Sequence, residues 1–251
     1  MSEGSPDPVQ QGAVQQGGLV PHAPWVYWPS FNLFKLVARL WFRQTATGRE
    51  LVPAQGGVIL VCNHASYLDP MMMGIEVGRQ ICYLAQKGLA KLPPVRWWMR
   101  KVGVVLVDRA APSREVMRRL EGHLLAGGCT CLFPEGTRSK DGSVGPFRPG
   151  VEFLVRRTGA TVVPVGLEGM SRAMPRGALM PRPYRTRVHF GAPWSPEQVL
   201  AAGGMEALRR TVAQLACAPL RDEGPAADES VPATPQGEAV PSQRSSAGVP
   251  S

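Results

Sequence analysis

The sequence predicts an α/β fold: a mostly parallel or mixed central sheet flanked by helices, preceded by an amphipathic helical segment. Two observations lead to this prediction. Short apolar runs with the length of strands alternate along the chain with longer runs of helical character. In addition, 44% of the 251 residues are hydrophobic, which is enough for a sizeable buried core. Strands and helices in alternation favour helices that cover a largely parallel sheet.

Composition divides the chain into three segments. Residues 1–24 are rich in Gly, Pro and Gln, and residues 221–251 are rich in Pro, Ser, Ala and Glu, so both ends are expected to be disordered. One folded domain over residues 25–220 is expected between them. The chain has no run of 18 or more apolar residues, so we expect no ordinary transmembrane helix.

The first part of the domain, residues 25–47, is expected to be helical and amphipathic. Its apolar residues share one helical face, namely Leu33, Leu36, Val37, Leu40 and Trp41. Basic residues step by four along another face, namely Lys35, Arg39 and Arg43, and an aromatic cluster precedes both. Such a helix suits a bilayer surface, although an ordinary helix packed on the domain has the same pattern. Because the rest of the domain is also basic, we favour membrane association.

The remaining elements follow in chain order. The apolar run at residues 57–62 predicts a buried strand, and five further strands are expected at 81–86, 104–107, 130–133, 161–167 and 187–190. Helices are expected at 70–77, 95–102, 114–126, 151–157 and 205–216. Ser113 stands where a helix-capping residue is expected.

The charge of the chain points to an anionic partner. The formal net charge is +9, and because both ends are acidic, residues 21–220 carry about +14. A domain this basic favours an anionic lipid surface, a phosphorylated substrate or nucleic acid. Nucleic acid ranks last, because the basic residues are spread out and no nucleic-acid-binding motif accompanies them.

The cysteine and histidine residues do not suggest a metal site or a disulfide framework. The five cysteines are an odd number without paired spacing, which indicates a reducing compartment. His22, His123 and His189 lack acidic or cysteine residues at ligand spacing. We therefore expect no metal.

His64 and Asp69 directly follow the strand expected at 57–62, where open α/β sheets place chemistry. Histidine suits a general base at neutral pH. If the chain turns into a helix between them, the Asp69 carboxylate can fold back and hold one ring nitrogen protonated, as the acid of a catalytic triad does. The alternative is a structural histidine followed by an ordinary helix start.

Two further polar clusters follow expected strands. Asp108 and Arg109 come after 104–107, and the sequence Phe-Pro-Glu-Gly-Thr-Arg-Ser occupies residues 133–139. In the second cluster, Gly136 permits a tight turn, Arg138 offers a planar fork that matches phosphate, and Glu135 could anchor that arginine or orient a substrate hydroxyl. Taken alone, the cluster also fits a solvated surface turn.

Together these motifs resemble the glycerolipid acyltransferase family, in particular the branch that contains the 1-acyl-sn-glycerol-3-phosphate acyltransferases. The resemblance covers about residues 35–215. Four blocks occur in the family's order: Asn63-His64-x4-Asp69, Gly103-x5-Arg109, residues 133–139, and Val163-Pro164-Val165.

The resemblance implies a role for each matching residue. His64 takes the proton of a lysophospholipid hydroxyl, and Asp69 orients and charges His64. The acceptor's phosphate and glycerol are assigned to Lys87, Arg109, Glu135, Gly136, Thr137 and Arg138. Pro164 is placed by the acyl donor or the pocket wall.

The implied activity moves a fatty acyl chain from acyl-CoA or acyl-carrier protein to 1-acyl-glycerol-3-phosphate, giving phosphatidic acid without a further cofactor. The implied setting is the cytosolic face of the cytoplasmic membrane, with an anionic surface as partner and no nucleic acid. Two alternatives remain: another lysolipid acceptor (lyso-ornithine lipid, lysocardiolipin or glycolipid), or a non-catalytic membrane-binding module.

Overall fold

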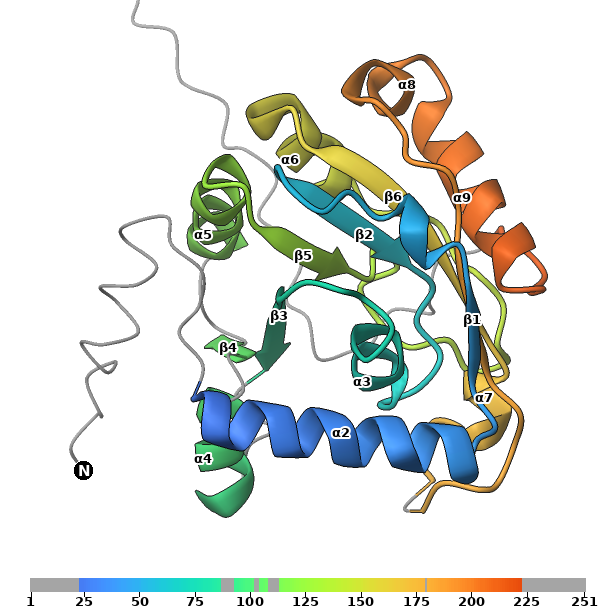
Figure 1. Ribbon diagram of the computed structural model, residues 1–251. Coiled ribbons are helices and arrows are strands. Elements are labelled where there is room, and N and C mark those ends of the chain that lie inside the picture. The colour runs from blue at the N-terminus through green and yellow to red at the C-terminus, as the bar shows by residue number, and fades with distance from the viewer. Residues whose placement is uncertain (1–22, 87–92, 102–103, 108–112, 179, 223–251) are drawn as a thin grey trace, which may run out of the picture.

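A seven-stranded sheet forms the centre of the computed structural model (Figure 1). The structure describes residues 23–86, 93–101, 104–107, 113–178 and 180–222. The strands are β1 (Thr45–Thr47), β2 (Val58–Cys62), β3 (Ile81–Gln86), β4 (Val104–Val107), β5 (Cys129–Leu132), β6 (Thr161–Glu168) and β7 (Arg187–Phe190). Their order across the sheet is β1-β7-β6-β2-β5-β3-β4.

The sheet is mixed, as expected. β2 pairs in parallel with both β5 and β6, and β3 pairs in parallel with both β5 and β4. β7 runs antiparallel to β6, and β1 is parallel to β7. The six expected strands are all present within one residue at either end. β1 was not expected from the sequence, because two of its three residues are exposed and they form no apolar run.

Helices cover both faces of the sheet. They are α2 (Pro24–Leu40), α3 (Asp69–Gly74), α4 (Pro93–Lys101), α5 (Ser113–Leu125), α6 (Gly150–Thr158), α7 (Met170–Ala173), α8 (Pro196–Leu200) and α9 (Gly204–Leu215), with a short 3-10 turn, η1, at Arg49–Leu51. α2, α3 and α7 contribute to the core on one face, and α5, α6, α8 and α9 contribute to the core on the other.

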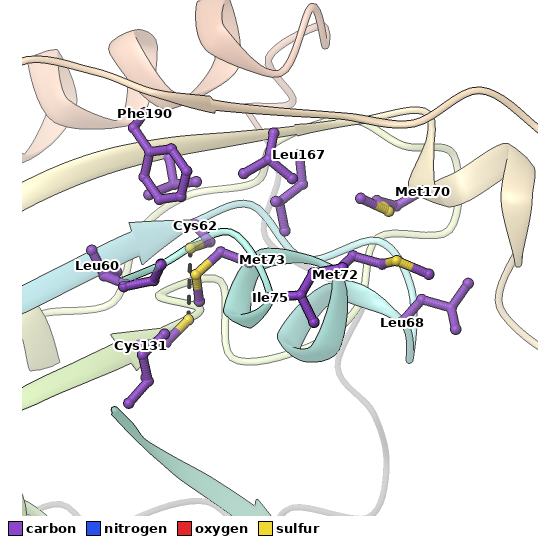
Figure 2. Packing of buried hydrophobic residues seen from close by; sticks show 14 of the residues in the cluster. Leu60, Cys62, Leu68, Met72, Met73, Ile75, Cys131, Leu167, Met170 and Phe190 are labelled. Atoms are coloured by element: carbon purple, nitrogen blue, oxygen red, sulfur yellow. Dashed lines mark hydrogen bonds between the residues drawn. The ribbon is translucent and has the colours of Figure 1, made fainter. Parts of the chain in front are cut away.

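Side chains of β2 alternate between these two cores, as the period of a strand requires. Leu60 and Cys62 pack with the α3 methionines Met72 and Met73, whereas Ile59 and Val61 face α5 and α6. Figure 2 shows the first of these cores, where Cys62 and Cys131 of β5 approach each other to 3.6 Å between sulfur atoms. The loop after Cys62 therefore begins directly above a closely packed apolar layer.

α2 lies along the domain and is the longest helix of the described residues (Figure 1). Its buried side includes Ala38, and Phe31 and Phe34 pack against the core. The apolar face expected from the sequence points outward, and its exposed side chains are Leu33, Leu36, Val37, Leu40 and Trp41. Trp25 and Trp28 of the preceding aromatic cluster are exposed as well. None of the helices in the described parts of the chain is long and apolar enough to cross a membrane.

Arg39 departs from the basic helical face expected from the sequence. Its guanidinium bonds to the buried Glu76 carboxylate at 2.9 Å, and it also donates to the backbone carbonyl of Gln44. Arg49 reaches the same carboxylate at 2.9 Å. Because a buried carboxylate needs compensating partners, Arg39 faces the domain rather than a membrane.

Candidate active site

The loops after β2 and β5 meet because the two strands are neighbours. The ladder runs in register from Val58 opposite Cys129 to Val61 opposite Leu132, so the two strands end at almost the same level. His64 follows the first strand and residues 133–139 follow the second. The sheet thereby brings together two of the sequence motifs at its carboxyl edge, where α/β proteins commonly bind ligands.

His64 and Asp69 lie in direct contact. His64 Nδ1 is 2.8 Å from Asp69 Oδ2, and Asp69 is the first residue of α3. The same carboxylate oxygen accepts hydrogen bonds from the backbone amides of Ala65 at 2.7 Å and Ser66 at 2.8 Å. Because an ionised carboxylate only accepts, Nδ1 of His64 carries the proton and Nε2 keeps its lone pair.

Contacts to the face of the imidazole ring and to the backbone of His64 fix the position of this residue. It stacks on Phe133 with ring centroids 4.2 Å apart and an angle of 26° between the planes. The backbone amide of His64 donates to Glu135 Oε1 at 2.8 Å, and its carbonyl accepts from the Ser139 amide at 2.7 Å. The side chain keeps 20% of its surface exposed, so a substrate can reach a ring whose orientation is fixed.

Glu135 is buried, and its carboxylate bridges two loops. One oxygen accepts from His64, and the other accepts from the Gly145 amide at 3.0 Å. Burial raises the pKa of Glu135, whereas the two backbone hydrogen bonds act in the opposite direction. These contacts differ from the anchor for Arg138 or the substrate contact suggested by the sequence. Glu135 instead positions the backbone of His64, because buried carboxylate oxygens bind where donors are available.

Gly136 adopts the left-handed conformation that glycine tolerates best, with φ at 73°. A Cβ at this position would lie 2.6 Å from Nε of Arg148, so a side chain would also collide with that guanidinium. Thr137 follows and is partly buried. The turn expected at Gly136 is therefore present, two residues before Arg138.

Arg138 lies against Tyr67 of the loop between His64 and Asp69. The guanidinium carbon is 3.4 Å from the centre of the Tyr67 ring. Nη1 of Arg138 is buried and has no hydrogen-bond partner among the residues that the structure describes. A buried donor without a partner costs free energy, so this arrangement favours binding of an anion.

Pro164 does not lie with these residues. It is inside β6, where it pairs with Val61, and its carbonyl accepts from the amide of Gly191. A Cβ added at Gly191 would meet both Pro164 Cγ and Leu215 Cδ1 of α9, so Pro164 packs toward α9. His64 is bonded to Asp69 of α3, and α3 packs on the other face of the sheet. The period of two along β6 turns the Pro164 side chain away from α3, and its placement by the acyl donor or the pocket wall stays a prediction.

Two residues assigned to the acceptor fall outside the described residues, namely Lys87 and Arg109. Asp108 does so as well.

Two side chains of the loop after β2, Asn63 and Ser66, support its conformation. The Asn63 side chain accepts from the Leu167 amide at 2.8 Å and donates to its carbonyl at 3.1 Å, which ties the loop to the end of β6. Ser66 Oγ is buried, donates to the Met174 carbonyl at 2.9 Å and accepts from the Leu68 amide. Ser66 is thus a loop-stabilising hydroxyl rather than a nucleophile. The aromatic residues Tyr67 and Phe133 inside the two motifs were the available signal for the stacking partners.

In the described residues, no three His, Cys, Asp or Glu side chains come together as metal ligands would. Four of the five cysteines are buried free thiols. Burial raises the pKa of Cys82 to about 11 and that of Cys129 to about 12, so these thiols stay protonated at neutral pH.

Comparison with known proteins finds a family model described as "Acyltransferase" that matches residues 43–168. The chain is 32% identical over 153 residues to the chloroplastic 1-acyl-sn-glycerol-3-phosphate acyltransferase BAT2 of Brassica napus. The aligned region covers 57% of this chain and 44% of that protein. The chain is 26% identical over 141 residues to the 1-acyl-sn-glycerol-3-phosphate acyltransferase of Bacillus subtilis, covering 56% and 70% of the two chains.

Among solved structures, the chain is similar to the 1-acyl-sn-glycerophosphate acyltransferase PlsC of Thermotoga maritima. The TM-score is 0.62 at 25% sequence identity, and the match covers 74% of this chain and 76% of that one. By contrast, the match covers less than half of the length of the chloroplastic plant relatives.

Proposed function

Because the chain belongs to the acyltransferase family, we propose that it transfers a fatty acyl chain from a thioester donor to the free hydroxyl of 1-acyl-glycerol-3-phosphate, giving phosphatidic acid. The family membership and the names of the relatives support this activity. The single observation that carries the mechanism is the 2.8 Å contact between His64 Nδ1 and Asp69 Oδ2 at the edge of the sheet.

His64 acts as the general base in this mechanism. Its Nε2 removes the proton from the acceptor hydroxyl as the oxygen attacks the thioester carbonyl. Asp69 stabilises the imidazolium that forms and keeps the ring in the tautomer required. The carbon–oxygen bond forms, the carbon–sulfur bond breaks, and His64 returns the proton to the leaving thiolate. A thioester is already activated, so no covalent enzyme intermediate is required.

Arg138 is the described residue best suited to the acceptor's phosphate. Its buried Nη1 lacks a partner, and a guanidinium can bind two phosphate oxygens at once. Lys87 and Arg109 remain assigned to the same group on the family resemblance. The proposed donor is acyl-CoA or acyl-carrier protein, and the proposed reaction needs no further cofactor.

The proposed location is the cytosolic face of the cytoplasmic membrane, bound at its surface. Support comes from the apolar surface formed by the exposed side of α2 together with Trp97 of α4, which we call the apolar surface of α2 and α4. α4 packs on α2 through Trp98, whose Nε1 donates to Ser30 Oγ at 2.9 Å. Exposed Trp97 lies 6.1 Å from Trp25 between ring centres. Aromatic and aliphatic side chains gathered in this way suit the bilayer interface, and the basic domain suits anionic lipid, with no role for nucleic acid.

The proposal is tested by incubating the purified protein with a panel of acceptors and one acyl donor at a time. The panel contains 1-acyl-glycerol-3-phosphate, lysocardiolipin, lyso-ornithine lipid and a monoacylated glycolipid, each with acyl-CoA and with acyl-carrier protein. We expect phosphatidic acid, detected by mass spectrometry, to be the fastest product. A faster product from another acceptor would reassign the substrate, and no product with any pair would leave only a membrane-binding role.

A further inference from the structure

Tyr67 lies in the loop between His64 and Asp69, and its side chain is about half exposed. Its ring stacks against the Arg138 guanidinium with 3.4 Å between the ring centre and Cζ. This contact joins the loop after β2 to the loop after β5 at the surface of the site. Tyr67 makes no contribution to the proton transfer described above, so its role needs another explanation.

The stack occupies the flat face of the Arg138 guanidinium and not its hydrogen-bonding edge. A guanidinium that packs its flat face on an aromatic ring keeps its N–H groups in the plane, where they can bind oxygen. Nη1 of Arg138 is buried and has no partner among the described residues. The ring therefore holds the arginine in place without using the donors that an anion requires.

Both ends of the stack are fixed relative to His64. On the Tyr67 side, the amides of Ala65 and Ser66 donate to the Asp69 carboxylate, and Ser66 Oγ accepts from the amide of Leu68. On the Arg138 side, the amide of the following residue, Ser139, donates to the carbonyl of His64 at 2.7 Å. The arginine and the base are consequently held at a set separation.

We propose that Tyr67 is a positioning residue that orients Arg138 toward a phosphate monoester and so selects acceptors in which that phosphate lies a short distance from the reacting hydroxyl. This inference rests on the proposed function, since it concerns the acceptor of the same reaction. In this proposal, Tyr67 affects recognition of the acceptor's phosphate and does not affect the chemical step.

The chain offers a matched control for the aromatic contact. Tyr184 also lies against an arginine, but Arg172 Cζ is 5.6 Å from its ring and the pair sits on the exposed α7 side of the molecule. Tyr184→Leu removes a surface aromatic ring, as Tyr67→Leu does, and neither substitution changes the net charge at neutral pH. Tyr184→Leu leaves the stack at Arg138 intact.

The experiment compares wild type with Tyr67→Leu, Tyr67→Phe and Tyr184→Leu in mixed micelles. The probe is 1-acyl-propanediol-3-phosphate, which keeps the phosphate but lacks the reacting hydroxyl, so binding is measured without turnover. Tyr67→Leu is expected to weaken binding by about fivefold, in the range of a partly exposed cation–π contact. Tyr67→Phe and Tyr184→Leu are expected to bind like wild type.

Steady-state kinetics give a second readout that a merely structural role would not produce. In Tyr67→Leu we expect the acceptor KM to rise by about fivefold while the donor KM and kcat stay within about twofold. In an Arg138→Ala background, Tyr67→Leu should add no further loss, because the ring acts through the arginine.

Each outcome decides one of the two proposals. Equal binding of the probe by wild type and Tyr67→Leu, or absence of binding by wild type, overturns the role of Tyr67. An equally large loss with 1-monoacylglycerol, which has no phosphate, also overturns it. If wild type binds the probe but forms no phosphatidic acid, the proposed function fails, whereas the binding comparison still decides the role of Tyr67.

Discussion

The buried carboxylate of Glu135 accepts a hydrogen bond from the backbone amide of His64 at 2.8 Å. A residue from the loop after β5 thus holds the backbone of the proposed catalytic base, which follows β2. Its other oxygen is bound by the Gly145 amide, so the position of His64 depends on a third segment of chain as well.

Replacement of Glu135 by glutamine should lower kcat by about tenfold or more while acceptor KM changes little, because the base is displaced but the anion site is kept. The amide group of glutamine offers one acceptor where two backbone amides need one each, and a buried amide left unpaired costs about 1–3 kcal/mol. Steady-state kinetics and chemical denaturation check both effects. Glu152→Gln, which changes an exposed glutamate paired with Arg156, is the matched control. Equal kinetics in the two variants would contradict the positioning role.

The stability of the protein should depend on pH through Glu135. Burial raises the pKa of this carboxyl above its usual value of 4.5, so the folded chain binds the proton more tightly than the unfolded chain. The contribution of Glu135 to stability is then fully present below pH 4.5 and is lost as the pH rises through the raised pKa. We expect the free energy of unfolding of wild type to fall relative to Glu135→Gln over this window. Denaturant titrations at stepped pH measure it, and a constant difference would argue against the raised pKa.

Loss of the proposed base should abolish most of the activity. His64→Ala removes the proton acceptor and is expected to lower kcat by about 10²- to 10⁴-fold, the usual contribution of general base catalysis. Asp69→Asn should lower kcat by a similar factor, because the ring loses the tautomer and the charge that support it. His189→Ala, which changes a histidine on β7 outside the site, is the control. Unchanged turnover in His64→Ala would remove this residue from the mechanism.

The apolar surface of α2 and α4 should carry membrane binding. Leu36→Glu and Leu40→Glu place charge on exposed positions of α2. The partition constant for vesicles, measured by co-sedimentation, should fall by about tenfold or more for each, because burial of a large apolar side chain contributes about 1.5–3 kcal/mol. Leu125→Glu changes an equally exposed leucine on α5, across the sheet, and should bind like wild type. Binding to anionic vesicles should also weaken as salt rises. If all three variants bind alike, the membrane contact lies elsewhere.

Pro164→Ala tests whether that residue takes part in binding the acyl donor. Because Pro164 packs toward α9 and not toward His64, kcat/KM for the acyl donor should stay within about twofold of wild type. Initial rates at varied donor concentration measure it. A large and selective rise in donor KM would instead support the placement of Pro164 by the acyl donor.

The sequence by itself determined the features that depend on residues close together in the chain. Strand and helix positions follow from local hydrophobic spacing, so the six expected strands were found within a residue of their ends. The contact between His64 and Asp69 spans only five residues, and a turn into a helix suffices to make it. The left-handed turn at Gly136 is also local.

Only the tertiary structure decided which distant segments meet. β5 inserts between β2 and β3 in the sheet, and no local pattern reveals that order, so the contact of Glu135 with His64 could not be foreseen. The same holds for Arg138 on Tyr67 and for Arg39 on the buried Glu76. The physical reason is that such contacts arise from strand order and from the need of buried charges for partners, and both are set when the whole chain packs.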